Sequence, residues 1–306
     1  MITSDVSGVL TEAPFRAGFV ALVGRANVGK STLLNALVGQ HLAIVSPKPH
    51  TTRHKLLGAL NGPGFQAGLL DTPGYLRGQR DQMDALMRGA LAEALAEADL
   101  VVLVAEPRPP GDVEQQMMAR IADSGTPALC VLNKTDTAKR PALLPVMAAY
   151  AEAHPFAEII PVSAATEDGI ERLGDLLAAH LPEREGPLFP PDTLTDRPVR
   201  FLCAELVREQ VFARFGHEVP YEVAVEVDTY EEREGTEPDL VEATITVDRP
   251  SQKAMLIGAR GEALKEIGTG ARVAIEELVG RPVYLRLWVK VTPKWRRKAG
   301  FVQRLR

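Results

Sequence analysis

The sequence predicts a doubly wound α/β domain followed by a smaller α+β domain, and three observations carry this prediction. Residues 24–31 read G-R-A-N-V-G-K-S, which fits a phosphate loop between a strand and a helix. Short apolar runs then alternate with helical patterns as far as residue 180. A proline-rich stretch separates them from a second order of elements. Because 306 residues exceed one typical domain, two domains are expected.

Composition is that of a globular protein of the reducing cytoplasm. Hydrophobic residues make up 45% and charged residues 25% of the chain. Residues 1–16 have no long apolar run, so we expect a short extension and neither a secretion signal nor a membrane span. Cys130 and Cys203 are the only cysteines, which argues against a disulfide framework or a cysteine zinc site. The six histidines lack paired metal-ligand spacing.

The first half has the rhythm of a doubly wound sheet. Residues 19–23 are expected to form a buried strand, and residues 32–38 a helix that stops at Gly39. Further strands are expected at 65–70, 100–104, 128–132 and 159–162, with an edge strand at 54–60 and helices that include 83–98 and 170–180. The predicted domain therefore covers residues 17–181. Five prolines between residues 182 and 198 indicate a linker of limited flexibility.

The second half, residues 199–306, follows a different order. Residues 199–215 have the pattern of an amphipathic helix, and alternating apolar residues predict strands at 221–227 and 243–247. Two helices, 251–257 and 262–279, flank the break Gly258-Ala259-Arg260-Gly261, and a strand is expected at 283–291. The predicted order is α-β-β-α-α-β. No sequence pattern accounts for Gly268 and Gly270 inside the second of these helices.

The phosphate loop predicts a nucleotide site. A turn from strand to helix aims backbone N–H groups at an anion, where the helix dipole also favours negative charge. Lys30 would reach the β- and γ-phosphates, and the Ser31 hydroxyl would bind Mg²⁺. Asp71 follows an apolar strand directly, as a Walker-B aspartate does, and would hold Mg²⁺ through water. The N–H of Gly74 would sense the γ-phosphate.

A polar stretch with Pro47 and Pro49 leads to Thr51-Thr52-Arg53 and is expected to be a mobile loop. A threonine there would complete the Mg²⁺ coordination while the γ-phosphate is present and release it after hydrolysis. Thr52 is favoured over Thr51 for this role. The predicted catalytic residues are therefore Lys30, Thr52 and Gly74.

Asn133-Lys134-Thr135-Asp136, after a predicted strand, indicates guanine. An ionised carboxylate at Asp136 would accept hydrogen bonds from guanine N1–H and the 2-amino group, which adenine does not offer. Backbone N–H groups of Ser163-Ala164-Ala165 would face guanine O6. The predicted nucleotide-binding residues are Gly24, Arg25, Ala26, Asn27, Val28, Gly29, Lys30, Ser31, Thr32, Asp71, Thr72, Pro73, Gly74, Tyr75, Asn133, Lys134, Thr135, Asp136, Ser163, Ala164 and Ala165.

Charge is concentrated at one end of the chain. The net charge is −5, yet residues 281–306 hold nine lysines and arginines and no acidic residue. A basic end on an acidic chain suggests a polyanionic partner, and the alternative is a solvated basic tail.

Together these motifs resemble a translation-factor-related GTPase over residues 17–181. Such proteins usually have proline where this chain has Ala26. Asn27 matches the asparagine that helps to hold K⁺ in related potassium-stimulated GTPases, and a loop-stabilising hydrogen bond is the alternative. Tyr75 stands where Ras-like proteins have a water-orienting glutamine, and its phenol is expected to turn away. Intrinsic hydrolysis is therefore expected to be slow until a partner completes the site.

The second half resembles a type II KH domain, in which a G-x-x-G loop clamps single-stranded nucleic acid. The resemblance makes Arg260 a phosphate contact and Ile257 part of an apolar groove, with Lys253, Lys265 and Arg272 as further cationic candidates. Trp288 is expected in the core, and Trp295 is expected to stack on a base. The predicted RNA-binding residues are Ile257, Gly258, Ala259, Arg260, Gly261, Lys265, Arg272 and Trp295.

A GTPase domain joined to a type II KH domain is similar to a family of bacterial ribosome-assembly GTPases. That resemblance implies binding near the 3′ end of small-subunit ribosomal RNA, a role in 30S assembly, and peripheral contact with the inner membrane. Two alternatives stay open: a constitutive RNA-binding module with a structural nucleotide, and a membrane-associated signalling GTPase.

Overall fold

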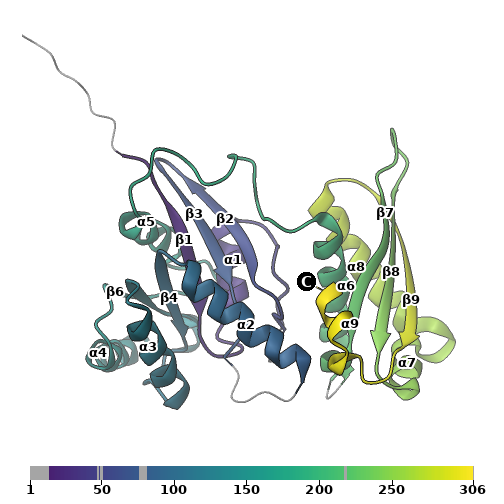
Figure 1. The fold of residues 1–306 in the computed structure, drawn as a ribbon, viewed down its shortest axis with the longest axis horizontal. Coiled ribbons are helices and arrows are strands. Elements are labelled where there is room, and N and C mark those ends of the chain that lie inside the picture. The colour runs from purple at the N-terminus through teal and green to yellow at the C-terminus, as the bar shows by residue number, and fades with distance from the viewer. Residues whose placement is uncertain (1–13, 47, 49–50, 76–80, 217–218, 306) are drawn as a thin grey trace, which may run out of the picture.

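The computed structural model describes residues 14–46, 48, 51–75, 81–216 and 219–305. The expected N-terminal extension, Pro47, Pro49 and Arg306 lie wholly or largely outside these residues. The chain forms two sheets, each with its own helices (Figure 1). Within the described part of the chain, no helix is long and apolar enough to cross a membrane.

The first sheet has six strands in the order β2-β3-β1-β4-β5-β6. Its strands are β1 (Arg16–Val23), β2 (Leu56–Gly62), β3 (Phe65–Asp71), β4 (Leu100–Ala105), β5 (Ala128–Leu132) and β6 (Glu158–Pro161). β2 is antiparallel to β3 at one edge, and the other neighbours are parallel. The predicted doubly wound sheet and its edge strand are thus confirmed, and the sheet is mixed.

Helices cover both faces of this sheet, which explains why its central strands are apolar on both sides. Helices α1 (Lys30–Val38) and α5 (Ile170–His180) pack with Val20 and Leu22 of β1 on one face. Helices α2 (Gln82–Glu97), α3 (Asp112–Ser124) and α4 (Leu143–Ala153) pack with Ala21 and Val23 on the other. The period-2 alternation of β1 therefore distributes its side chains between two cores.

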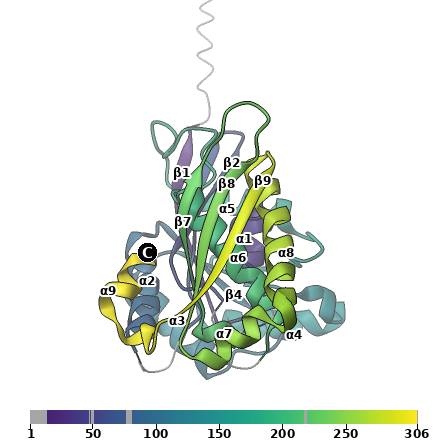
Figure 2. The ribbon, with the colours of Figure 1, turned by 90° about the vertical axis from the view of Figure 1, so that its right-hand side faces the viewer.

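The second sheet has the order β7-β8-β9, formed by Ala224–Glu231, Asp239–Val247 and Val283–Val291. β7 and β8 are antiparallel, whereas β8 and β9 are parallel. Helices α6 (Val199–Arg214), α7 (Pro250–Ile257) and α8 (Glu262–Val279) bury one face, and Figure 2 shows the sheet in front of α6. The predicted order α-β-β-α-α-β is confirmed. The first strand starts later than expected, because residues 219–222 form the short 3₁₀ segment η3 (Val219–Glu222).

The structure corrects the prediction for both tryptophans. Trp295 belongs to the C-terminal end, and this end contacts the first domain. The 3₁₀ turn η5 (Trp295–Arg297) and helix α9 (Ala299–Arg304) follow β9 and lie beside α2 (Figure 1). Trp295 is 0% exposed, and its Nε1 donates to the Glu222 carbonyl at 2.9 Å. Its ring is therefore not available to stack on a base. Trp288 is 48% exposed on the open face of the sheet instead of in the core.

Of the two helical glycines that the sequence does not explain, only Gly270 lies in a tight contact. A Cβ at Gly270 would lie 2.2 Å from the Gln210 side-chain oxygen, so this glycine lets α8 approach α6 closely. Gly268 has room for a Cβ, with its nearest neighbour at 3.6 Å in Leu287, and it lines a groove described below. The cost of glycine in a helix, about 1 kcal/mol against alanine, is thus offset by close packing at Gly270.

His54 should make the fold less stable at mildly acidic pH. Its ring is 8% exposed and packs edge-on against Phe201. Burial lowers the pKa of His54 to about 3 from the usual 6.5. The positive charges of Arg208, Arg53 and Arg197 also lower this pKa, whereas the negative charge of Glu205 raises it. Between pH 6.5 and pH 3, His54 binds a proton in the unfolded chain and not in the folded protein. The free energy of unfolding therefore falls as the pH drops below 6.5. The loss between pH 7 and pH 5 should be about 2 kcal/mol.

Denaturant titrations at pH 7, 6 and 5 measure this loss. His54→Phe should be less sensitive to pH than the wild type by about 2 kcal/mol over this interval. His180→Phe, on the half-exposed end of α5, is the matched control and should keep the wild-type dependence. Equal pH dependence of the wild type and His54→Phe would contradict the assignment.

Candidate functional site

The phosphate loop needs glycine at two positions. Gly24 and Gly29 have φ values of 151° and 94°, in the region that favours glycine. A Cβ on Gly24 would lie 2.2 Å from the Val104 carbonyl oxygen, and one on Gly29 would lie 2.3 Å from Nδ2 of Asn133. The loop therefore runs directly against β4 and the base-recognition segment before α1 begins.

Lys30 is buried at the start of α1 and turns back over the loop. Its Nζ donates to the Arg25 carbonyl at 2.9 Å and to the Gly24 carbonyl at 3.3 Å. Burial lowers the pKa of Lys30 to about 8, against the opposing effect of Asp71. A phosphate group placed here would raise this pKa again and further favour the charged form of the lysine.

Three oxygen-bearing side chains converge beside Lys30. The Ser31 hydroxyl lies 2.6 Å from Oδ2 of Asp71 and 2.9 Å from Oγ1 of Thr52, and Thr52 Oγ1 lies 3.3 Å from the same carboxylate oxygen. Asp71 is fully buried, and its Oδ1 has no hydrogen-bond partner in the described structure. Burial raises the pKa of Asp71 despite Lys30 and the two hydroxyls. A buried carboxylate oxygen without a partner, beside two hydroxyls, fits a hard cation such as Mg²⁺.

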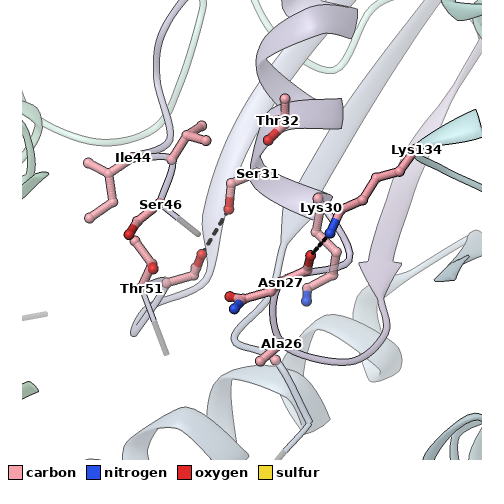
Figure 3. Close-up of a pocket in the computed structure, with 13 residues that line it drawn as sticks. Ala26, Asn27, Lys30, Ser31, Thr32, Ile44, Ser46, Thr51 and Lys134 are labelled. Atoms are coloured by element: carbon pink, nitrogen blue, oxygen red, sulfur yellow. Dashed lines mark hydrogen bonds between the residues drawn. The ribbon is translucent and has the colours of Figure 1, made fainter. Parts of the chain in front are cut away.

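The two neighbouring threonines face in different directions. Thr51 Oγ1 donates to the Lys48 carbonyl at 2.8 Å, whereas Thr52 faces Ser31 and Asp71. Figure 3 shows this loop across the pocket from Ser31, Lys30 and Asn27. The cavity between them has a volume of about 260 Å³. It is lined by Ala26, Asn27, Gly29, Lys30, Ser31, Thr32, Ile44, Val45, Ser46, Thr51, Thr52, Gly74 and Lys134.

The loop after β3 touches the phosphate loop directly. A Cβ on Gly74 would lie 2.6 Å from the Cα of Ala26, and the Tyr75 N–H donates to the Gly24 carbonyl at 3.2 Å. The Tyr75 hydroxyl donates to Oε1 of Gln116 at 2.8 Å, and Arg120 lies 5.1 Å from the centre of the ring. The phenol thus turns towards α3, and only the backbone of Tyr75 lies against the phosphate loop.

The base-recognition segment is bonded to the phosphate loop. Asn133 is buried, and its Nδ2 donates to the Val28 carbonyl while its Oδ1 accepts from the Ala164 N–H, both at 2.9 Å. Lys134 has φ 63° and donates from Nζ to the Asn27 carbonyl. Asp136 Oδ1 accepts from the Ser163 hydroxyl at 2.6 Å. The two predicted base segments, residues 133–136 and 163–165, therefore lie together, and of them Lys134 lines the pocket.

Some predicted nucleotide residues, among them Arg25, Val28 and Thr72, do not line the pocket. The Val28 side chain is 2% exposed in the core, and the Arg25 guanidinium lies 3.8 Å from Glu114 of α3. The Thr72 hydroxyl donates to the Leu22 carbonyl at 2.7 Å, which secures the loop to β1. These side chains therefore contact other parts of the first domain and lie outside the pocket lining.

A groove of about 470 Å³ lies between α8 and β9 in the second domain. Gly258, Arg260 and Gly261 precede α8 with positive φ values of 71°, 52° and 83°. Of the predicted residues, Gly261, Lys265 and Arg272 line the groove, and Arg272 forms a 2.9 Å ion pair with Glu276. Ile257 instead packs against the domain core, and Trp295 lies in the domain interface.

Sequence reasoning missed part of each site. Tyr284, Leu285 and Leu287 form the β9 wall of the groove. They lie on a predicted strand that follows the two helices around the G-x-x-G loop, and this position could have marked them as candidate lining residues. Ile44 to Ser46 line the nucleotide pocket, and the sequence has no local feature that marks them.

Comparison with known proteins gives a family for each of the two domains. Residues 19–134 match a family described as 50S ribosome-binding GTPase, and residues 218–296 match the KH domain family. A GTPase Era of Geobacter metallireducens is 44% identical over 288 residues, covering 94% of this chain and 96% of the relative. A GTPase Era of Xylella fastidiosa is also 44% identical, over 283 residues, covering 92% of this chain and 94% of the relative.

Solved structures are similar over both domains. A crystal structure of Era with MgGDPNP and nucleotides 1506–1542 of 16S ribosomal RNA has a TM-score of 0.90 and 37% identity, and covers 94% of this chain and 98% of that one. A variant of Aquifex aeolicus Era bound to GDP·AlF₄⁻ has a TM-score of 0.91 and 37% identity, with the same coverage.

Proposed function

Because the chain belongs to the Era family of GTPases, we propose that it is a GTP-hydrolysing switch that binds the 3′ end of 16S ribosomal RNA and assists 30S assembly. Residues 17–181 would act as the GTPase domain, 182–198 as a linker, and 199–306 as the RNA-binding domain. One observation carries the proposal. A nucleotide pocket and a G-x-x-G groove occur in one chain that is similar, over 94% of its length, to an Era bound to both ligands.

The residues of the pocket suggest how each part would act. Ser31, Thr52 and Asp71 would hold Mg²⁺, which supplies positive charge against the β- and γ-phosphates. Lys30 and the backbone N–H groups of the phosphate loop would bind the phosphates, and Gly74 N–H would lie beside the γ-phosphate. Asp136 would accept both guanine N–H donors, with Asn133 keeping its segment against the phosphate loop.

Hydrolysis by this site alone would be slow. Tyr75 takes the position of the water-orienting glutamine, and its hydroxyl bonds to α3. No other side chain in the predicted set replaces that glutamine, so a partner would have to complete the site. The proposal includes K⁺ held with the help of the Asn27 side chain, beside the main-chain carbonyl of Asn27 that accepts a hydrogen bond from Lys134. Equal hydrolysis in KCl and NaCl would remove K⁺ from it.

RNA affinity should depend on the bound nucleotide. A fragment matching nucleotides 1506–1542 of 16S ribosomal RNA should bind about tenfold tighter with GDPNP and Mg²⁺ than with GDP, because Thr52 and Gly74 line the pocket and would contact the γ-phosphate there. Fluorescence anisotropy with labelled RNA measures this difference. The matched control is an RNA of the same length and composition in scrambled order.

Two outcomes would redirect the proposal. Identical RNA affinity with GDPNP, GDP and no nucleotide would favour a constitutive RNA-binding module. Binding to phosphatidylglycerol vesicles that excess RNA does not displace would favour a membrane-associated signalling GTPase that uses its basic end. Crosslinking of the GTP-bound chain to cellular RNA, followed by sequencing, would identify the RNA directly.

A further inference from the structure

One face of α6, in the second domain, contacts the loop that carries Thr51 and Thr52. Glu205, Arg208, Glu209 and Phe212 follow one another at helical spacing, so they share this face. The loop runs from His41 to His54 in the first domain, and its described residues are 41–46, 48 and 51–54. We call these residues the Thr52 loop. The nucleotide pocket thus has a wall whose support comes from the other domain.

Arg208 makes the contact nearest to the metal-binding side chains. Its guanidinium is 1% exposed, and Nη2 donates to the Thr51 carbonyl at 2.6 Å. Nε donates to Oε1 of Glu205 at 2.7 Å, and the guanidinium lies 5.3 Å from the centre of the Phe212 ring. A buried guanidinium with a paired carboxylate and a stacked ring has little freedom to move. Its bond to Thr51 is therefore a fixed, charge-assisted contact.

Contacts earlier in the Thr52 loop agree with this arrangement. Glu209 accepts the Val45 N–H at 2.7 Å and lies 3.0 Å from Nε2 of His41. Lys48 Nζ donates to the Phe212 and Phe215 carbonyls, where α6 ends and its dipole favours a cation. Both ends of the α6 face therefore bind the loop.

Arg53 secures the other side of Thr52. Its side chain is 3% exposed, and it donates to the Val223 carbonyl at 2.6 Å and to the Tyr221 carbonyl at 3.0 Å. The second domain thus forms hydrogen bonds with the Thr51 carbonyl, just before Thr52, and with the Arg53 side chain, just after it. Between these two bonds, the Thr52 hydroxyl faces Ser31 and Asp71.

We propose that Arg208 is a positioning residue for GTP-dependent metal binding, so that the second domain helps to build the site on the first. This inference rests on the proposed function. A free loop would lose conformational entropy when Thr52 joined the metal site, and Arg208 removes part of that loss in advance. The reverse coupling follows by linkage: a ligand that displaces α6 from the Thr52 loop weakens binding of Mg²⁺ and GTP.

Arg208→Met in the full chain tests the inference. The Mg²⁺ concentration for half-maximal binding of fluorescent GDPNP should rise about tenfold, the effect of losing one charge-assisted hydrogen bond. GDP affinity in EDTA should change less than twofold. Hydrogen exchange of residues 41–54 should become faster without nucleotide. Arg208→Lys retains one donor and should recover part of each change.

Two further variants make the result decisive. The double variant Glu205→Gln with Arg208→Met also removes the carboxylate that Arg208→Met alone leaves without its arginine partner. If the single variant misfolds, the Mg²⁺ dependence of the double variant tests the inference. Arg214→Met is the matched control, because Arg214 lies on the same helix and bonds to Gln210 and Glu266. A folded Arg208 variant with wild-type Mg²⁺ dependence would overturn the inference. Failure of the wild type to bind GDPNP would instead overturn the proposed function.

Discussion

Asp136→Asn should weaken GTP binding by about a hundredfold or more and favour xanthosine triphosphate. Two charge-assisted hydrogen bonds to the base would be lost, each with a net contribution of about 1.5–3 kcal/mol. The amide that replaces the carboxylate can instead donate to the 2-carbonyl of xanthine. The Ser163 hydroxyl bonds to Asp136 and holds position 136 near the segment of Ala164, so the change alters the base contact and spares the phosphate loop.

Competition of GTP, xanthosine triphosphate and ATP against fluorescent GDP measures the preference. Asp123→Asn makes the same chemical change on the exposed side of α3 and is the matched control. An Asp136→Asn protein that still prefers GTP would show that another residue reads the base.

Gly258→Asp combined with Gly261→Asp should abolish RNA binding, with a loss of at least about a hundredfold, and leave GTP binding intact. Both positions have a φ that favours glycine, 71° and 83°, and a Cβ on Gly258 would lie 2.7 Å from the Cβ of Ala263. Two added carboxylates would also repel the phosphates that a G-x-x-G loop holds. The nucleotide pocket has no lining residue in this domain.

The matched control is Gly235→Asp combined with Gly280→Asp. These glycines have φ values of 66° and 71°, belong to the same domain, and have no atom within 4 Å of an added Cβ. The control adds the same charge, also at positions of positive φ, away from the groove and without the steric contact of Gly258. An equal loss of RNA affinity in both double variants would mean that strain or net charge, and not the G-x-x-G loop, explains the effect.

Local patterns predicted most of the fold. Helices α5 and α8 and strand β9 have the residue limits that periodicity and stop signals indicated. The nucleotide motifs also depend on local sequence, since each follows a strand whose carboxyl end lies at the same sheet edge. For this reason the segments around Ser31, Asp71 and Asn133 could be expected to meet.

The tryptophans could not be placed in this way. The alternation of side chains along β9 predicts two faces of the sheet and does not say which face the helices cover. The expectation that Trp288 lies in the core is therefore wrong: its side chain lies on the open face. Trp295 lies in a basic stretch that resembles an exposed tail, and part of the cluster in which it is buried, including Met83 and Met87, belongs to the other domain. The contact of Arg208 with Thr51 is likewise invisible in sequence, because neither residue belongs to a motif that marks the other.

The cluster around Trp295 constrains how this protein can diverge. Its members come from α2, from Ala224 of β7 and from the C-terminal end, and Arg296 forms ion pairs with Asp81 at 2.7 Å and with Asp84 at 3.4 Å. Asp81 caps α2 by accepting the Asp84 N–H. A substitution in this cluster, on either domain, therefore changes the surface against which the other domain packs. Because residues 83, 87 and 295 pack in one cluster across the two domains, a chimera that joins the first domain of one relative to the second domain of another is expected to disturb this packing.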